Sequence, residues 1–150
     1  MKVLIADDNA TSRKLLRLTL AAGGHEVVEA ADGQEALEKL DSSPVDAVIS
    51  DILMPRMDGY RFCYEARRKA SLHDLPIIIY SATYTSPGEE TVALNMGADR
   101  FLRKPAPAAV ILSALSDVTG RPRVAARSQA PASDLQVLKQ YSERLVQKLE

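Results

Sequence analysis

Five short strand-like segments alternate with five helical patterns over the first 118 residues, and this alternation constrains the fold more than any other feature. The strand-like segments cover residues 2–6, 25–30, 45–50, 76–80 and 99–103. The helical patterns lie between residues 9 and 23 and at residues 34–40, 59–70, 89–96 and 107–118. Strands and helices that alternate at this spacing predict one α/β domain, whose parallel sheet has right-handed crossovers and helices on both faces.

The apolar content of each segment indicates where it lies in that sheet. Residues 76–80 (PIIIY) are the most apolar and indicate a central strand, whereas residues 99–103 (DRFLR) are more polar and indicate an edge. Asn9 or Thr11 can cap the first helix. The side of that helix that we expect to be buried consists of Leu15, Leu16, Leu18 and Leu20.

Polar residues follow the strand-like segments where these segments end. The carboxyl ends of parallel strands share one edge of the sheet, and open α/β proteins carry their chemistry at that edge. We therefore expect five residues that are distant in sequence to converge there, namely Asp7, Asp8, Asp51, Ser81 and Lys104.

The residue types at this edge suit phosphoryl transfer. Three carboxylates repel each other unless a cation binds, and Mg²⁺ accepts carboxylate, water and phosphate oxygens. A metal ion beside Asp51 would assist transfer of a phosphoryl group onto that carboxylate, because an aspartate can act as a covalent nucleophile. Lys104 is a point charge that can reach a phosphoryl oxygen, and Ser81 offers a hydroxyl.

The composition excludes several classes of protein. A net charge of −1 argues against dedicated nucleic-acid binding, and no helix-turn-helix or zinc spacing is present. No apolar run approaches the roughly 20 residues of a membrane span, and the acid pair at residues 7–8 comes too early for a signal peptide. Cys63 is the only cysteine, which excludes an intramolecular disulfide and a cysteine metal site. We therefore expect a cytoplasmic protein.

Four sequence blocks resemble the receiver domain of two-component response regulators over residues 1–118. They are the pair Asp7-Asp8, the block DILMPRMDG at residues 51–59, the pair Ser81-Ala82, and Phe101 with Lys104-Pro105. The resemblance implies a flavodoxin-like, doubly wound parallel sheet of five strands in the order 2-1-3-4-5 with five helices.

The resemblance also implies a metal site. By this resemblance Asp8 and Asp51 bind Mg²⁺ directly, Asp7 binds it largely through water, and the backbone carbonyl of Leu53 completes the protein ligands. Mn²⁺ is an alternative ion for the same ligands. No other cofactor is implied.

The same resemblance assigns a role to each remaining residue of the site. Asp51 is the phosphoacceptor, Ser81 and Lys104 contact the phosphoryl group, and Ser81 and Phe101 act as the switch between two states of the domain. The phosphoryl donor in this family is a phosphohistidine of a histidine kinase or a phosphotransfer protein. The chain is then a signalling switch rather than a conventional enzyme, with self-phosphorylation and autodephosphorylation as its only reactions.

Three other functions are compatible with parts of the pattern. A haloacid-dehalogenase-like phosphatase also uses an aspartate after a strand, but it needs a second acid where this chain has Leu53. A flavodoxin-like cofactor binder needs a phosphate loop after the first strand, where the sequence DDNA is acidic. A scaffold that is never phosphorylated would not need the complete set of residues. The apolar Leu53 also suggests slow autodephosphorylation, because it can exclude the attacking water.

The composition of the sequence changes after residue 118. Residues 119–133 have the composition of a linker, and residues 134–150 carry a heptad stripe of Leu135, Leu138, Leu145 and Leu149. Such a short helix needs a partner, so we expect a coiled-coil-like helix that forms a homodimer. Alternatively, it begins the signalling helices of a longer hybrid histidine kinase whose output lies beyond residue 150. Neither reading predicts direct binding to nucleic acid or membrane.

Overall fold

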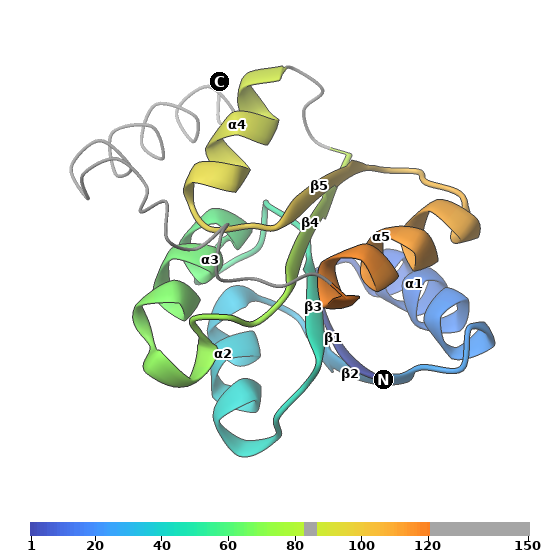
Figure 1. Ribbon diagram of the computed structural model, residues 1–150, viewed down its shortest axis with the longest axis horizontal. Helices are drawn as coiled ribbons and strands as arrows, with labels where there is room; N and C mark the ends of the chain where they lie inside the picture. The colour runs from blue at the N-terminus through green and yellow to red at the C-terminus, as the bar shows by residue number, and fades with distance from the viewer. Residues whose placement is uncertain (83–86, 121–150) are drawn as a thin grey trace.

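One parallel sheet organises the chain, as seen in a computed structural model (Figure 1). The structure describes residues 1–82 and 87–120. The predicted helix at residues 134–150 lies outside the described residues, as does all but the start of the predicted linker at residues 119–133.

Within the described residues the sheet has five strands, which are β1 (Lys2–Ala6), β2 (Glu26–Ala30), β3 (Ala47–Ser50), β4 (Ile77–Ser81) and β5 (Arg100–Arg103). Their order is β2-β1-β3-β4-β5, and every pairing is parallel. The predicted flavodoxin-like sheet is therefore confirmed. Strand β4 is an interior strand with all residues buried, although β3 holds the middle position, and β5 lies at an edge as expected.

The described helices are α1 (Ala10–Ala22), α2 (Gly33–Ser42), α3 (Gly59–Arg68), α4 (Pro87–Asn95) and α5 (Ala108–Gly120), with a short 3₁₀ turn, η1 (Ala70–Leu72). Helices α1 and α5 cover one face of the sheet, and α2, α3 and α4 cover the other (Figure 1). Successive strand residues enter opposite cores: Val3 and Ile5 join the α1–α5 core, while Leu4 and Ala6 join the α2–α4 core. Because both faces are covered, the inner strands are apolar throughout.

Helix α1 buries fewer leucines than the sequence predicts. Leu16 and Leu20 are buried, whereas Leu15 is 62% exposed and Leu18 is 53% exposed. The prediction was wrong for Leu15 and Leu18 because one strip of the helix faces the sheet, and residues four apart in sequence share that strip. Asn9 is the N-cap, and its side chain accepts a hydrogen bond from the backbone N–H of Ser12 at 2.9 Å.

Several helix ends differ from the predicted boundaries. Helix α3 ends at Arg68 rather than at residue 70, because the chain tightens into η1. Helix α4 begins at Pro87, a residue type that suits the first helical turn because its missing N–H has no helical acceptor there. Helix α5 continues to Gly120, beyond the predicted end at residue 118. None of the helices described is both long and apolar enough to cross a membrane.

Candidate functional site

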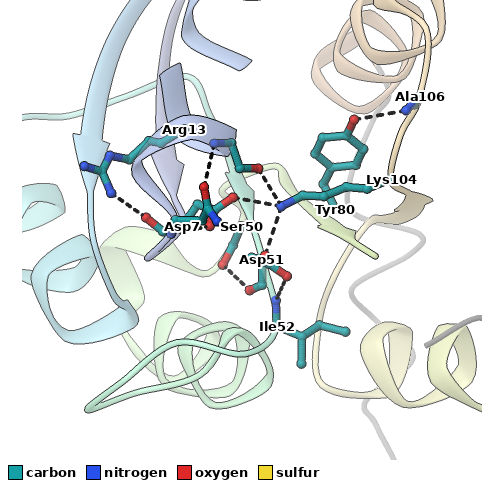
Figure 2. A network of polar contacts seen from close by, with 10 residues as sticks. Asp7, Arg13, Ser50, Asp51, Ile52, Tyr80, Lys104 and Ala106 are labelled. Atoms are coloured by element: carbon teal, nitrogen blue, oxygen red, sulfur yellow. Dashed lines mark hydrogen bonds and ion pairs between the residues drawn. The ribbon is translucent and has the colours of Figure 1, made fainter. Parts of the chain in front are cut away.

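Side chains from the ends of β1, β3 and β5 meet around the ammonium group of Lys104 (Figure 2). The Lys104 Nζ donates hydrogen bonds to Asp7 Oδ2 at 2.8 Å, to Asp51 Oδ2 at 3.0 Å and to Ser12 Oγ at 2.9 Å. These contacts join residues that are up to 97 positions apart in sequence. The predicted convergence of Asp7, Asp51 and Lys104 is therefore what the geometry shows.

Asp51 is held in a fixed orientation directly after the buried strand β3. Its Oδ1 accepts the backbone N–H of Ile52 at 2.6 Å, and its Oδ2 accepts Lys104, so each carboxylate oxygen has a partner. The start of α3 packs closely behind it, because a Cβ on Gly59 would lie 2.0 Å from the Asp51 carbonyl oxygen. Only glycine permits this approach. The side chain remains 13% exposed, which leaves the carboxylate accessible to a reactant.

Asp7 is more deeply buried than Asp51 and is also fixed at both oxygens. Its Oδ1 accepts the backbone N–H of Asn9 at 2.9 Å, while its Oδ2 accepts Lys104. The Asp7 backbone carbonyl accepts Nη1 of Arg13 at 2.7 Å, which ties the end of β1 to the first turn of α1. Asp8 follows it and is exposed, so its carboxylate is free to approach a ligand from solvent.

The electrostatic balance of this edge is negative. Burial of the Lys104 ammonium works to lower its pKa, but the hydrogen bonds and charges of Asp7 and Asp51 outweigh burial, and the pKa is raised above its ordinary value. Lys104 is therefore charged at neutral pH. One ammonium pairs with the two carboxylates of Asp7 and Asp51, and the neighbouring Asp8 adds a third, so negative charge is in excess.

The donor set at this edge suits a hard divalent cation. Carboxylate oxygens are the ligands that Mg²⁺ prefers, and a second cation would balance the excess negative charge. In residues 1–82 and 87–120, no group of three acidic, histidine or cysteine side chains is already arranged around a metal position. Lys104 lies between Asp7 and Asp51 instead, so the ammonium and a metal ion would share the same oxygens.

Ser81, Phe101 and Leu53 are the remaining residues predicted for the site. Ser81 ends β4, is fully buried, and its backbone carbonyl accepts the backbone N–H of Lys104 at 3.1 Å. Phe101 lies on β5 opposite Ile79 in register and packs, half-buried, against the α2–α4 core. Leu53 lies two residues beyond Asp51 and packs against the same core.

An ion pair anchors the β3–α3 loop, residues 51–58, to the start of α2. Arg56 donates from Nε to Asp32 Oδ2 at 2.9 Å and from Nη2 to Asp32 Oδ1 at 3.2 Å. Burial of Asp32 works to raise its pKa, but the hydrogen bond from Arg56 and the backbone N–H of Glu35 prevail, and the pKa is lowered. Gly33 donates to the carbonyl of Met57 at 2.9 Å, which adds a second anchor.

The sequence patterns did not identify Ser12, Tyr80 or the Asp32–Arg56 pair as parts of this edge. Ser12 has a partial signal, because it lies in the first turn of the helix that follows Asp7 and Asp8, but the pattern does not indicate a contact with Lys104. Tyr80 has a weaker signal, since an aromatic residue in a buried strand is expected to be core. Its polar end, however, needs a hydrogen-bond partner.

Comparison with known proteins supports one family for this constellation. The model of the response regulator receiver domain matches residues 3–116. Response regulator MprA of Mycobacterium avium is 36% identical over 134 residues, which are 89% of this chain and 54% of that protein. The chain thus spans about half the length of this curated relative.

Solved structures of the same kind have the same fold. A putative response regulator from Chloroflexus aurantiacus is 32% identical with a TM-score of 0.77, and the match covers 80% of this chain and 98% of that one. Chemotaxis protein CheY4 of Vibrio cholerae is 37% identical with a TM-score of 0.73 over 78% of this chain and 97% of that one. The polar residues at the strand ends, the order of the strands and these matches all agree. The chain therefore belongs to the response regulator receiver domain family.

Proposed function

We propose that this chain is a phosphorylation-activated switch of two-component signalling, with Asp51 as the phosphoacceptor. The observation that carries the proposal is the single carboxylate at the end of β3, oriented by Ile52 and Lys104 and still reachable from solvent. A nucleophile needs this combination of fixed direction and access.

The proposed reaction transfers a phosphoryl group from a phosphohistidine of a histidine kinase or a phosphotransfer protein. A carboxylate oxygen of Asp51 forms a bond to phosphorus, the bond between phosphorus and the imidazole nitrogen breaks, and the electron pair remains on that nitrogen. The product is an aspartyl phosphate. Lys104 and the hydroxyl of Ser81 contact the phosphoryl oxygens in this proposal, which is supported by their positions at neighbouring strand ends.

Receiver domains in general bind Mg²⁺, and the residues at this edge suit it. We propose Asp8 and Asp51 as direct ligands, Asp7 as a ligand through water, and the Leu53 carbonyl as the remaining protein ligand, with Mn²⁺ as an alternative ion. When bound, the ion neutralises charge on the phosphoryl oxygens and on the carboxylates. The chain's own contribution is Lys104, which balances part of that charge in the absence of phosphate.

We propose Ser81 and Phe101 as the elements that report phosphorylation. The backbone carbonyl of Ser81 accepts the backbone N–H of Lys104. In this proposal, a movement of either residue toward a phosphoryl group also displaces the strand end that carries the other residue. Phe101 is half-buried on the edge strand β5, and in this proposal it moves inward on phosphorylation. Such a shift between two states is how a local charge change becomes visible to a partner.

The proposed organisation is a receiver domain at residues 1–118, a linker at 119–133 and a dimerising helix at 134–150. The partners are a kinase or phosphotransfer protein and a second copy of the chain, with no direct contact to nucleic acid or membrane. We propose that the chain acts in the cytoplasm, which is typical of receiver domains.

The proposal is tested by incubation with acetyl phosphate and Mg²⁺, followed by intact-mass measurement. The wild type is expected to gain one phosphoryl group, and Asp51→Asn is expected to gain none. Asp41→Asn is the matched control, because Asp41 is a surface carboxylate that is 60% exposed and distant from the sheet edge. Equal modification of the wild type and Asp51→Asn would refute the assignment, and modification of neither would favour the scaffold.

A further inference from the structure

Tyr80 lies directly beside the ammonium group of Lys104 (Figure 2). The Lys104 Nζ is 5.4 Å from the centroid of the Tyr80 ring, a distance at which a cation is attracted to an aromatic face. The Tyr80 hydroxyl accepts the backbone N–H of Ala106 at 3.1 Å. One side chain therefore contacts both Lys104 and the loop that follows it.

The position of Tyr80 in the sheet explains how it reaches both groups. It is the penultimate residue of β4, pairs with Leu102 of β5, and belongs to the α1–α5 core. The residue is only 9% exposed, so the hydroxyl needs a protein partner, which Ala106 supplies. Lys104 lies on the same side, two residues beyond Leu102.

Lys104 is thus held at its backbone, through the loop that follows it, and at its ammonium group. Its backbone N–H bonds to the carbonyl of Ser81, the loop that follows it is held by Tyr80, and its ammonium lies within reach of the Tyr80 ring and the Ser12 hydroxyl. A lysine side chain is long and flexible, so each of these contacts reduces the set of positions that Nζ can occupy.

These contacts differ in kind from the ion pairs of Lys104. Asp7 and Asp51 are charged. A metal ion would compete with the Lys104 ammonium for these carboxylates, and a phosphoryl group would compete with the carboxylates for the ammonium. Neither the Tyr80 ring nor the Ser12 hydroxyl carries a net charge, so they do not take part in this competition. They can keep Lys104 near Asp51 while its ionic partners change.

We propose that Tyr80, assisted by Ser12, is a positioning residue that keeps Lys104 directed at the acceptor Asp51. The proposal deepens the proposed function and rests on it for its effect on phosphorylation. Its structural part, the contact between Tyr80 and Lys104, can be measured whether or not Asp51 is phosphorylated.

The first measurement is the NMR spectrum of the Lys104 ε-methylene group in protein with ¹³C-labelled lysine. An aromatic ring shifts the resonances of nearby protons, so the wild-type signal is expected away from its random-coil position. Tyr80→Leu is expected to abolish that shift, and Tyr80→Phe, which keeps the ring and loses only the hydroxyl, is expected to retain it. A wild-type signal that is unchanged in Tyr80→Leu would overturn the proposal.

The second measurement is the initial rate of Asp51 modification by acetyl phosphate with Mg²⁺. Tyr80→Leu is expected to slow it about 3- to 10-fold, while Tyr80→Phe stays within about 2-fold of the wild type, because the cation–ring attraction is retained. Ser12→Ala is expected to slow the reaction further when combined with Tyr80→Leu.

The matched control is Ile78→Val, which removes a buried methyl group from the same strand and the same core without touching Lys104. It is expected to lower thermal stability and leave both measurements unchanged. If Ile78→Val slows modification as much as Tyr80→Leu does, the role of Tyr80 is only structural and the proposal is overturned. If the wild type is not modified at all, the proposed function fails, and the NMR shift alone decides whether Tyr80 positions Lys104.

Discussion

Lys104 is the residue on which the site depends, because its ammonium group contacts Asp7, Asp51 and Ser12 at the same time. Asp51 retains one oxygen bonded to the backbone of Ile52, so loss of the Lys104 contact would leave its direction partly defined. The backbone N–H of Ile52 orients Asp51, the proposed acceptor, and Lys104 both orients it and balances its charge.

We propose that Leu53 slows the loss of a phosphoryl group from Asp51. It is half-buried, packs against the α2–α4 core and lies two residues beyond Asp51, and its apolar side chain offers no hydrogen bond to an attacking water. Leu53→Asn is expected to accelerate loss of phosphate several-fold, because an amide can hold the attacking water by hydrogen bonding. The measurement is the half-life of the phosphorylated protein after the phosphodonor is removed.

The control for Leu53→Asn is Leu112→Asn, which places the same amide at a partly buried position in the opposite core. That variant is expected to lose stability without changing the half-life. An unchanged half-life in Leu53→Asn would remove Leu53 from the account of dephosphorylation.

The residues of the site that end a strand could be predicted from the sequence, and the residues that support them could not. Asp7 and Asp51 follow apolar segments and Lys104 follows the more polar edge segment, so the carboxyl edge of a parallel sheet brings them together. Ser12 and Tyr80 lie inside a helix and a strand, where local patterns assign them to a helix surface and a core. Their contacts with Lys104 depend on how α1 and β4 pack, which no local pattern encodes.

At the scale of elements, the β3–α3 loop is held from both sides. Arg56 and Met57 contact the start of α2, while Asp58 caps α3 by accepting the backbone N–H of Arg61 at 3.0 Å. The loop carries Leu53 and follows Asp51 directly. Its rigidity therefore bears on both the proposed metal ligand and the acceptor.

Arg56 combines a stabilising ion pair with an unfavourable backbone. Its φ of 63° lies in the left-handed region, which glycine adopts without strain and other residues do not. Arg56→Ala and Arg56→Gly both lose the pair with Asp32, but only the alanine variant keeps the strain. The glycine variant is therefore expected to be more stable than the alanine variant by about 1 kcal/mol, measured by denaturant unfolding.

Equal stabilities of these two variants would show that the loop changes conformation once the ion pair is gone. The matched comparison is Lys69→Ala and Lys69→Gly, because Lys69 also forms an ion pair but has a φ of −88°. There the glycine variant is expected to be no more stable than the alanine variant.

The sequence predicted where a helix forms better than it predicted which residues of the helix are buried. The apolar pattern located α1, but its leucines surround much of the helix, so the pattern did not select the strip that faces the sheet. Burial was decided by the sheet, which accepts Leu16 and Leu20 and leaves Leu15 and Leu18 in solvent.

At the scale of the whole molecule, two cores on either side of one sheet explain why the fold was predictable. Each inner strand supplies alternate residues to the two cores, so it needs apolar residues at nearly every position. That requirement produces continuous apolar runs, and the acids and the serine that end these runs are then conspicuous. The fold and the site are therefore encoded by the same boundaries between apolar and polar residues.

At the scale of the whole molecule, the heptad stripe after residue 134 predicts that two copies of the chain form a dimer. Leu138 and Leu145 occupy seam positions of the stripe, so Leu138→Asp with Leu145→Asp would place charges between two helices. Light scattering is expected to find the wild type as a dimer and this double variant as a monomer. Gln140→Asp with Gln147→Asp adds the same charge at outward-facing positions and is expected to leave the dimer intact. A wild type that remains monomeric at high protein concentration would rule out dimerisation through this segment.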